Sequence, residues 1–326
     1  MNVKQKLIEL FENNRNETLS GEELAERLGC SRAAVWKAVK ALRSEGYAID
    51  AASGKGYCLA PETDVLSTAG VEKYLSGKGK EAVIDVRQSV DSTNNVLRDM
   101  ARAGAPEGTA VISAMQTGGK GRLGRSFFSP SNTGLYLSLL LRPDTHAADS
   151  VRITTAAAVA VARAIFKCTG QSPQIKWVND VYLRGLKVCG ILTEAAFSLE
   201  SGGLDYAVVG IGINVYEPEG GFSEELKGIA GAVLEERQED LRNRLAAEVI
   251  SELLNCCGDL FSEDMLNDYR SRLMWKGEAI RVISGRTEYP CTLLGVDDSY
   301  ALLVRREDGS EQAVSSGEIT IRRLDI

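Results

Sequence analysis

The sequence predicts an α+β protein in three parts: an N-terminal winged helix-turn-helix, a central mixed sheet with helices, and a small C-terminal β-barrel. Three observations lead to this prediction. The first 60 residues contain two short helical patterns joined by a tight turn, residues 65–275 alternate strand-like with helical runs, and the last 50 residues contain only short strand-like runs. We therefore expect domains at residues 1–64, 65–275 and 276–326.

Composition and charge exclude several classes of protein. The 326 residues carry a net charge of −7, and no apolar run approaches the ~20 residues that span a bilayer. The N-terminus lacks a signal-peptide core and the seven cysteines form no C-x-x-C pair, so we expect a cytoplasmic protein with free thiols and no membrane association. The single histidine, His146, excludes Ser-His-Asp triads and H-E-x-x-H zinc sites, and we predict no metal-binding residues.

The N-terminal 60 residues concentrate positive charge on one helix. Residues 29–44 contain four cations and no acidic residue. A capping box at residues 20–23 begins a first short helix, and a tight turn leads from it into the basic helix. Helical spacing places Val35, Val39 and Leu42 on one packing face and leaves the cations on the others. This is the spacing of a helix-turn-helix, whose second helix lies in the major groove of DNA.

A two-stranded hairpin with a basic tip follows and completes a winged helix. The predicted DNA contacts are Ser31, Arg32, Trp36, Lys37, Lys40, Arg43 and, at the tip of the wing, Lys55. Specific operator binding by such a module usually requires two copies related by a two-fold axis, so we expect a homodimer. A basic helix on an interaction domain that never meets DNA is the alternative.

The central part alternates strands with helices, as expected of an α+β sheet with helices against one face. Candidate strands cover residues 82–86, 109–115, 134–141, 174–177, 188–195 and 207–214. Candidate helices cover residues 94–103, 151–168 and 239–261.

Residues 118–125, Gly-Gly-Lys-Gly-Arg-Leu-Gly-Arg, form a glycine-cation loop that predicts an anion clamp. Glycine N–H groups can form a concave anion site, and Lys and Arg add counter-charge. The loop satisfies G-x-G-x-x-G, but it runs into an aromatic segment broken by Pro130 where a dinucleotide site requires a helix. Lys120 is followed by glycine, which excludes a P-loop. A surface loop with solvated cations is the alternative.

Four polar clusters follow the predicted strands. They are residues 91–94, Gln116 with the glycine-cation loop, residues 176–180 with Lys187, and residues 210–214. Each is weak alone, because small hydroxyls and amides at the start of a helix often serve only as caps. Their order and spacing together carry the prediction of a single site.

In this order and spacing the clusters resemble those of biotin protein ligases, of the bifunctional kind that also represses biotin genes. The resemblance covers essentially the full length and implies a class II synthetase-like catalytic domain and an SH3-like C-terminal barrel. It implies that biotin and ATP, with Mg²⁺ on the phosphates, form biotinyl-5'-AMP, and that biotin then passes to a lysine of the biotin carboxyl carrier protein of acetyl-CoA or pyruvate carboxylase. It also implies that the adenylate is the corepressor on operator DNA.

The resemblance also implies roles for individual residues. The implied catalytic residues are Arg122, Lys187 and Asp180. The implied biotin-binding residues are Ser92, Thr93, Asn94, Gln116, Lys120, Gly121, Arg122 and Lys187. The implied nucleotide-binding residues are Gly119, Arg125, Phe127, Lys176, Asn179, Gly212 and Asn214. Phe127 is implied to stack on the adenine, and Asp180 to act through Mg²⁺ or on the acceptor amine.

Two other functions share part of this pattern. A lipoate protein ligase uses the same adenylation chemistry, and a ligand-sensing transcription regulator could keep the fold after losing ligase activity. The predicted DNA-binding part and the clamp of Lys120, Gly121 and Arg122 disfavour the first alternative, and the full set of polar groups disfavours the second.

Overall fold

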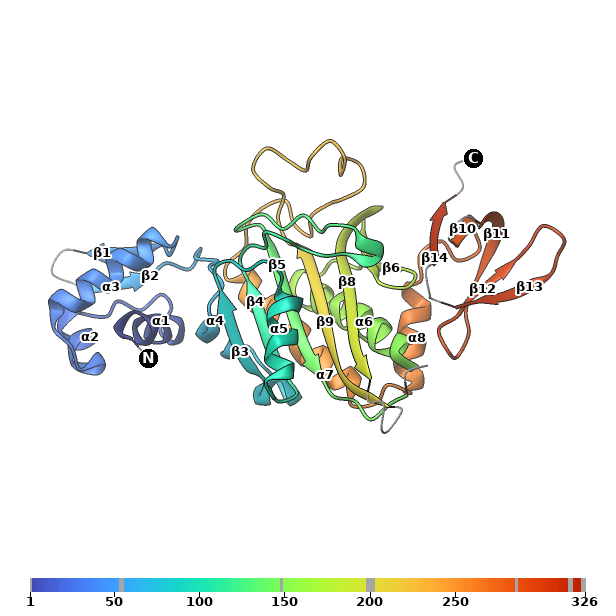
Figure 1. Cartoon of the computed structure of the whole chain (residues 1–326). Helices are drawn as coiled ribbons and strands as arrows, with labels where there is room; N and C mark the ends of the chain where they lie inside the picture. Colours follow the sequence, from blue (N-terminus) through green and yellow to red (C-terminus); the bar gives the residue numbers. More distant parts are fainter. Residues whose placement is uncertain are drawn as a thin grey trace.

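The computed structural model describes residues 2–52, 56–146, 149–197, 203–284, 287–315 and 319–323. Their strands form three sheets, of two, seven and five strands. The N-terminal helices lie at one end of an elongated molecule, the seven-stranded sheet lies in the middle, and the five-stranded sheet lies at the other end (Figure 1). Lys55, the predicted wing-tip contact, lies outside the described residues.

Three helices and a hairpin form the N-terminal part. They are α1 (Val3–Asn13), α2 (Gly21–Leu28), α3 (Arg32–Ser44), β1 (Ile49–Ala52) and β2 (Gly56–Leu59). The side chains of Ser20 and Ser31 accept hydrogen bonds from the first turns of α2 and α3, which explains where both helices begin. Gly29 ends α2 in the left-handed conformation that glycine adopts without a Cβ clash. The predicted helix-turn-helix and hairpin are both present.

α1 is an additional helix that the sequence pattern did not predict. Its Leu7 and Phe11, four residues apart, are buried in a core shared with α2 and α3. A capping box between Asn2 and Gln5 begins it. α1 packs against α3, so the two helices form one unit.

The central sheet is mixed, as predicted. Its strands are β3 (Val83–Arg87), β4 (Thr109–Ser113), β5 (Gly134–Leu141), β6 (Gln174–Lys176), β7 (Asp180–Leu183), β8 (Leu186–Phe197) and β9 (Leu204–Asn214). They lie in the order β3-β4-β5-β9-β8-β7-β6, with β3 and β4 parallel and every other pair antiparallel. β7 is a strand where the sequence indicated only a polar segment.

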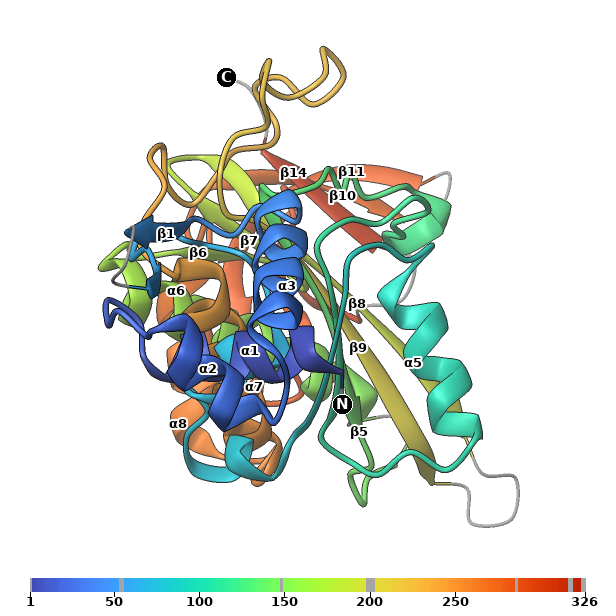
Figure 2. The same ribbon diagram turned by 90° about the vertical axis from the view of Figure 1, so that its left-hand side faces the viewer.

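Helices cover both faces of this sheet, so the expectation of helices against one face is wrong. One face packs on α6 (Ser150–Thr169) and α7 (Leu241–Cys257), and the other on α5 (Thr93–Arg102) (Figure 2). Strand β5 shows the physical reason, because its side chains alternate between two cores: Leu139 lies in the core under α6 and α7, and Leu140 lies in the core under α5. Every residue of β5 is buried.

The remaining helices are short and join the parts of the molecule. They are α4 (Thr68–Glu72), the 3-10 turn η1 (Gly77–Glu81) and α8 (Glu263–Arg272). α4 contacts both α1 and α7. In the part of the chain that the structure describes, no helix is both long and apolar enough to cross a membrane.

The C-terminal part is a five-stranded antiparallel sheet. Its strands are β10 (Ala279–Ser284), β11 (Thr287–Val296), β12 (Leu302–Arg305), β13 (Glu311–Val314) and β14 (Ile319–Arg323), in the order β13-β12-β11-β10-β14. The short strands predicted for the last 50 residues are present, and β13 and β14 form the two edges. Side chains such as Val282 and Leu293 join the core of the central sheet. Nε1 of Trp177 also donates to the carbonyl of Tyr300 at 2.9 Å, which ties the two sheets together.

Candidate active site and DNA-binding face

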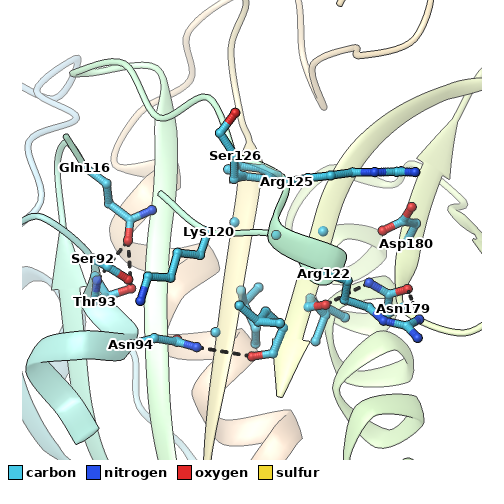
Figure 3. A pocket seen from close by; sticks show the side chains of 18 of the residues that line it. Ser92, Thr93, Asn94, Gln116, Lys120, Arg122, Arg125, Ser126, Asn179 and Asp180 are labelled. Carbon is cyan, nitrogen blue, oxygen red and sulfur yellow. Dashed lines mark hydrogen bonds between the residues drawn. The ribbon is translucent and has the colours of Figure 1, made fainter. Parts of the chain in front are cut away.

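A pocket lies where the N-terminal end of α5, the glycine-cation loop and strands β7 to β9 meet (Figure 3). One wall carries the hydroxyls and amides that come from α5 and from the end of β4, and the opposite wall carries Arg122, Asn179 and Asp180. All of the predicted biotin-binding residues line this pocket. The predicted nucleotide-binding residues that line it are Arg125, Phe127, Asn179 and Gly212.

Glycines form the floor of the pocket. Gly190 of β8 pairs with Gly212 of β9, and the ring of Phe127 lies across them. A Cβ on Gly212 would lie 2.5 Å from Cε1 of Phe127, and a Cβ on Gly190 would lie 3.2 Å from Cε2. Gly210 leaves the same kind of room for Asn94, because a Cβ there would lie 2.2 Å from Oδ1 of Asn94. The floor is therefore open because Gly210 and Gly212, alternate residues of β9, and Gly190 of β8 have no side chains.

Two residues of this floor, Gly190 and Leu192, were not among the predicted site residues. A signal for them is present in the sequence. Cys189 and Ile191 are buried in the core of the opposite face, so alternation along β8 turns Gly190 and Leu192 towards the pocket. This alternation can be interpreted only when the pairing of β8 with its neighbouring strands is known.

The neutral polar wall is a connected hydrogen-bond network. Oε1 of Gln116 accepts from the backbone N–H of Thr93 at 2.9 Å and from its hydroxyl at 3.1 Å. The hydroxyl of Ser138 donates towards Thr93 and Asn94, and Nδ2 of Asn94 donates to Glu194 at 2.7 Å. Such a buried network holds its members in fixed positions because each lost bond leaves a buried polar group unpaired.

Ser92 occupies the N-cap position of α5 but makes no side-chain capping hydrogen bond. The view that Ser92 serves only as a helix cap is therefore wrong. Ser92 is 2% exposed and lines the pocket. A hydroxyl in this place can donate to or accept from a bound polar group.

The glycine-cation loop closes on itself over the pocket. The N–H of Phe127 donates to the carbonyl of Gly119 at 2.9 Å, and the N–H of Gly121 donates to the carbonyl of Arg125 at 2.7 Å. Between them, Leu123 and Gly124 have positive φ values of 57° and 72°. Only the short 3-10 turn η2 (Arg122–Gly124) interrupts the loop, and no helix begins after it. The rejection of a dinucleotide motif is thereby confirmed.

Cations and a carboxylate face each other at the mouth of the pocket. Nζ of Lys187 lies 2.7 Å from Oδ1 of Asp180, and Nη1 of Arg122 donates to Oδ1 of Asn179 at 3.1 Å. Burial lowers the pKa of Arg122, while the charge of Asp180 acts in the opposite direction. Lys120 reaches back to the α5 wall, where its Nζ donates to Oδ1 of Asn95 at 2.7 Å. Two cations, Arg122 and Lys187, thus lie beside Asn179 and Asp180, and a third, Lys120, is held by the opposite wall.

Lys176 lies behind this mouth rather than in the pocket lining. Its Nζ lies 5.7 Å from the ring centroid of Tyr182 and 5.2 Å from that of Trp275. Burial lowers the pKa of Lys176; Asp180 raises it and nearby cations lower it further. One of those cations, Arg322 of β14, was missed by sequence reasoning and belongs to the C-terminal sheet.

Two other predicted residues have framework contacts and do not line the pocket. Gly119 accepts the hydrogen bond from Phe127, and a Cβ on it would lie 2.4 Å from the carbonyl oxygen of Phe127. Nδ2 of Asn214 donates to the carbonyl of Gly231 at 3.1 Å. The N–H of the same residue, Gly231, donates to the carbonyl of Lys187. Gly231 therefore contacts both Asn214 and Lys187.

The structure offers one carboxylate for a metal ion in the pocket. Oδ1 of Asp180 is buried and forms an ion pair with Nζ of Lys187 at 2.7 Å. Among those residues, no group of three or more His, Cys, Asp or Glu side chains converges to hold a metal.

The second candidate surface is the exposed face of α3. Val35, Val39 and Leu42 are buried, as predicted. Six of the predicted DNA contacts are exposed residues on the other faces: Ser31, Arg32, Trp36, Lys37, Lys40 and Arg43. Ser31 also caps α3, and the guanidinium of Arg43 donates to the carbonyl of Ile49, which ties α3 to the hairpin.

Trp36 is 53% exposed on the same helix as Lys37 and Lys40. Nζ of Lys40 lies 5.5 Å from its ring centroid. An indole flanked by cations on a protruding helix presents both an apolar contact and phosphate counter-charge.

Comparisons with known proteins agree with both surfaces. A model of the HTH domain matches residues 3–58, and a model of the Biotin/lipoate A/B protein ligase family matches residues 86–214. The chain is 33% identical over 321 residues to the bifunctional ligase/repressor BirA of Bacillus subtilis, covering 96% of this chain and 97% of that protein. It is 34% identical over 331 residues to the BirA of Escherichia coli, covering 99% and 98%.

A solved structure with a similar fold gives the same result. A biotin protein ligase from Aquifex aeolicus in complex with biotin and ATP superposes with a TM-score of 0.63 at 27% identity, covering 74% of this chain and 99% of that chain. Since the identity to both BirA proteins extends over nearly the full length of each, the chain belongs to the family of bifunctional ligase/repressors represented by BirA.

Proposed function

We propose that this protein is an ATP-dependent biotin protein ligase that also represses biotin genes. The observation that carries the proposal is the pocket of Figure 3, which joins a neutral hydrogen-bonding wall to a cationic mouth. Biotin has the matching polarity, with a neutral ureido ring at one end and a carboxylate at the other. Both ends can be bound at once only by a site with two chemically different walls.

The neutral wall would hold the ureido ring. The network of Thr93, Asn94 and Gln116 presents hydroxyl and amide groups that both donate and accept, and Ser92 adds a hydroxyl that is not used as a cap. A site built to hydrogen-bond a neutral ring rejects analogues that lack those groups, because its buried polar atoms would remain unpaired. Lipoate carries no ureido group, so this wall favours biotin.

The cationic mouth would carry the first chemical step. The carboxylate of biotin attacks the α-phosphorus of ATP, a new C–O–P linkage forms, and pyrophosphate leaves with the electron pair of the broken P–O bond. Two anions must approach each other, and Lys120, Arg122 and Lys187 offer three positive charges within the pocket lining. Fixed cations lower this barrier by compensating charge in the transition state and by holding both reactants in contact.

The nucleotide would occupy the side of the pocket near Phe127. Its ring already lies over Gly190 and Gly212, so an adenine would stack on the ring or take its place above the glycines. Arg125 and Asn179 line this side, and Gly119 and Asn214 support the loop and strand around it. Lys176, with Arg322 from β14, would offset the negative charge of the departing phosphates.

The residues present also fit Mg²⁺. That ion is usually held by one or two carboxylates together with substrate phosphates, and Asp180 supplies a carboxylate in the pocket lining. When bound, Mg²⁺ would neutralise charge on the phosphates. In the second step the acceptor lysine amine loses a proton and attacks the acyl carbon, an amide bond forms, and AMP leaves with the electron pair of the broken C–O bond. Asp180 is the carboxylate in the pocket lining that can take the proton.

The acceptor would be a lysine of the biotin carboxyl carrier protein of acetyl-CoA or pyruvate carboxylase. The repressor function would use α3 on operator DNA as a homodimer, with biotinyl-5'-AMP as corepressor. We further propose domain boundaries at residues 64/65 and 275/276, a class II synthetase-like catalytic domain and an SH3-like C-terminal sheet. All seven cysteines are free thiols, which supports a cytoplasmic location.

One experiment tests the ligase and its alternatives together. The protein is incubated with ATP, Mg²⁺ and either biotin or lipoate, a carrier domain is added, and its mass is measured. We expect the mass gain of one biotinyl group on the carrier. Lipoyl transfer without biotinyl transfer would identify a lipoate ligase, and no adduct from either acid would identify a regulator without ligase activity.

A further inference from the structure

A closed ring of four charged side chains joins the N-terminal helices to the central part. Glu12 and Arg15 come from the end of α1, Lys73 follows α4, and Asp240 precedes α7. Arg15 bonds both oxygens of Glu12, at 2.8 and 3.0 Å, and reaches Asp240 at 2.7 Å. Nζ of Lys73 lies 2.6 Å from Glu12 and 2.7 Å from Asp240. Each charge therefore touches two of the opposite sign.

The ring is buried and electrically neutral. The side chains of Glu12 and Asp240 are 0% and 1% exposed, and those of Arg15 and Lys73 are 9% and 16% exposed. Burial opposes ionisation of Arg15, but the hydrogen bond and charge of Glu12 together with Asp240 hold the pKa of Arg15 above its ordinary value. A buried set of charges tolerates one arrangement, because displacing any member leaves its partners buried and uncompensated.

The connecting segment after β2 is docked on the same place. Oδ1 of Asp64 accepts from the backbone N–H of Arg242 at 2.8 Å, and its Oδ2 accepts from the guanidinium of Arg242 at 3.1 Å. Asn243 accepts from the N–H of Ser67 at 3.1 Å and donates to the carbonyl of Val65 at 2.8 Å. The segment is thus held by the first turn of α7 and is not a free tether.

The position of α1 determines the position of α3. The two helices share the core that contains Leu7 and Phe11, and Nζ of Lys4 pairs with Glu45 at 2.6 Å just after α3. Whatever holds the end of α1 therefore holds the exposed face of α3 as well.

We propose that the ring of Glu12, Arg15, Lys73 and Asp240 sets the orientation of the DNA-reading helix α3 relative to the central sheet, and so sets the half-site spacing that the protein selects. The inference rests on the proposed DNA-binding function. In a symmetric dimer the two reading helices must enter grooves about one helical turn apart or a multiple of it. A rigid connection rejects other spacings, and a loose connection accepts them at similar affinity.

The test compares the wild type with Lys73→Met, which removes one charge of the ring from the side that never meets DNA. Lys73→Arg keeps the charge and serves as the conservative rescue. Lys227→Met removes an exposed cation of the central part, paired with Glu224 at 3.3 Å, and is the matched charge control. An operator is first selected by the wild-type protein from a random DNA pool, with biotin, ATP and Mg²⁺ present in this and every later binding measurement so that the proposed corepressor can form.

Affinity is then measured for that operator and for a single half-site. It is also measured for versions whose half-sites are moved apart by 1 to about 5 base pairs, the largest shift being half a helical turn. At the unfavourable spacings we expect at least about a tenfold loss of affinity for the wild type, Lys73→Arg and Lys227→Met. A loss of this size is about what one mismatched base pair costs. We expect Lys73→Met to lose less than about threefold there, which is below that cost, with single-half-site affinity unchanged.

Wild-type spacing preference in Lys73→Met would overturn the role of the ring. Failure of the wild type to select any DNA would instead overturn the DNA-binding function, so the two failures are distinguishable. If Lys73→Met loses ligase activity and is misfolded, Glu12→Gln makes the same test from the other side of the ring. Amide hydrogen exchange at Ser67 gives a second readout, since we expect faster exchange in the loosened variant and an unchanged rate contradicts the proposal.

Discussion

The ammonium of Lys187 lies 2.7 Å from the carboxylate of Asp180, at the mouth of a pocket whose other end is neutral. The main chain of Lys187 is also clamped, because its N–H donates to Ile229 at 2.8 Å and its carbonyl accepts from Gly231 at 2.9 Å. A cation fixed at both its backbone and its head can meet a carboxylate substrate with little reorganisation.

Lys187→Ala should therefore impair adenylate formation severely. Removing one preorganised charge partner from a developing anion typically costs about 10²- to 10³-fold in rate. Biotin-dependent exchange of pyrophosphate into ATP measures the first step alone. Lys227→Ala, at an exposed ion pair, is the control and should exchange at the wild-type rate. Normal exchange in Lys187→Ala would remove this residue from the adenylation step.

Gly212→Ala should weaken the binding of ATP more than that of biotin. The added methyl would lie 2.5 Å from Cε1 of Phe127, so the ring or β9 must shift. Overpacking of this kind costs ~1 kcal/mol or more, which corresponds to at least about a fivefold rise in the KM for ATP. Combining it with Phe127→Leu should recover part of the loss.

The control for Gly212→Ala is Gly118→Ala in the same loop region, where a Cβ would come no closer than 3.4 Å to the carbonyl oxygen of Asp91. Its KM for ATP should stay within about twofold of the wild type, as expected of a substitution without steric conflict. Equal KM values for ATP in the wild type and Gly212→Ala would show that the Phe127 contact does not form part of the nucleotide site.

The lowered pKa of Lys176 leads us to predict that catalysis with ATP declines at alkaline pH. Because burial lowers its pKa, Lys176 is charged below that lowered pKa and loses its charge as the pH rises through it, earlier than an ordinary lysine does. We expect kcat/KM for ATP to fall on the alkaline side in the wild type. Lys176→Arg should keep its charge and hold kcat/KM to higher pH. Superimposable alkaline limbs of the two profiles would argue against Lys176 as the group responsible.

Two substitutions on α3 should separate phosphate contacts from base contacts. Lys37→Ala should weaken binding to all DNA sequences and reduce the slope of log affinity against log salt by about 1. Trp36→Ala should leave that slope unchanged and cost about 1–3 kcal/mol on the selected operator only. Fluorescence anisotropy over a salt series measures both. If the slope of log affinity against log salt in both Lys37→Ala and Lys40→Ala equals that of the wild type, this face of α3 does not contact DNA.

Prediction from the sequence succeeded where a pattern is local. The capped α2 and α3 and the strand β5 have strong caps or uniform apolar runs, and each lies where the sequence predicts it. Prediction failed where contacts between residues far apart in the chain determine the secondary structure. β7 is a four-residue strand that exists because β6 and β8 flank it, and α8 carries few apolar residues of its own.

The candidate site shows the same division. Every predicted biotin-binding residue lines the pocket, because each polar cluster ends or follows a strand and those ends meet. Gly190 and Leu192 were missed, since alternation along β8 has meaning only once its two faces are known. Arg322 was missed because nothing local connects residues near the C-terminus with Lys176.

The sequence by itself determined the chemistry of this protein: a helix-turn-helix, an anion-clamping loop, and the set of amides, hydroxyls and cations that the loop accompanies. Periodicity, capping and residue type are properties of neighbours along the chain, so they can be read without a structure. Only the tertiary structure decided that α5 covers the opposite face of the sheet, that Phe127 lies over Gly212, and that Lys73 pairs with both Glu12 and Asp240. Those relationships join residues far apart in the chain, and packing and the satisfaction of buried charges select them.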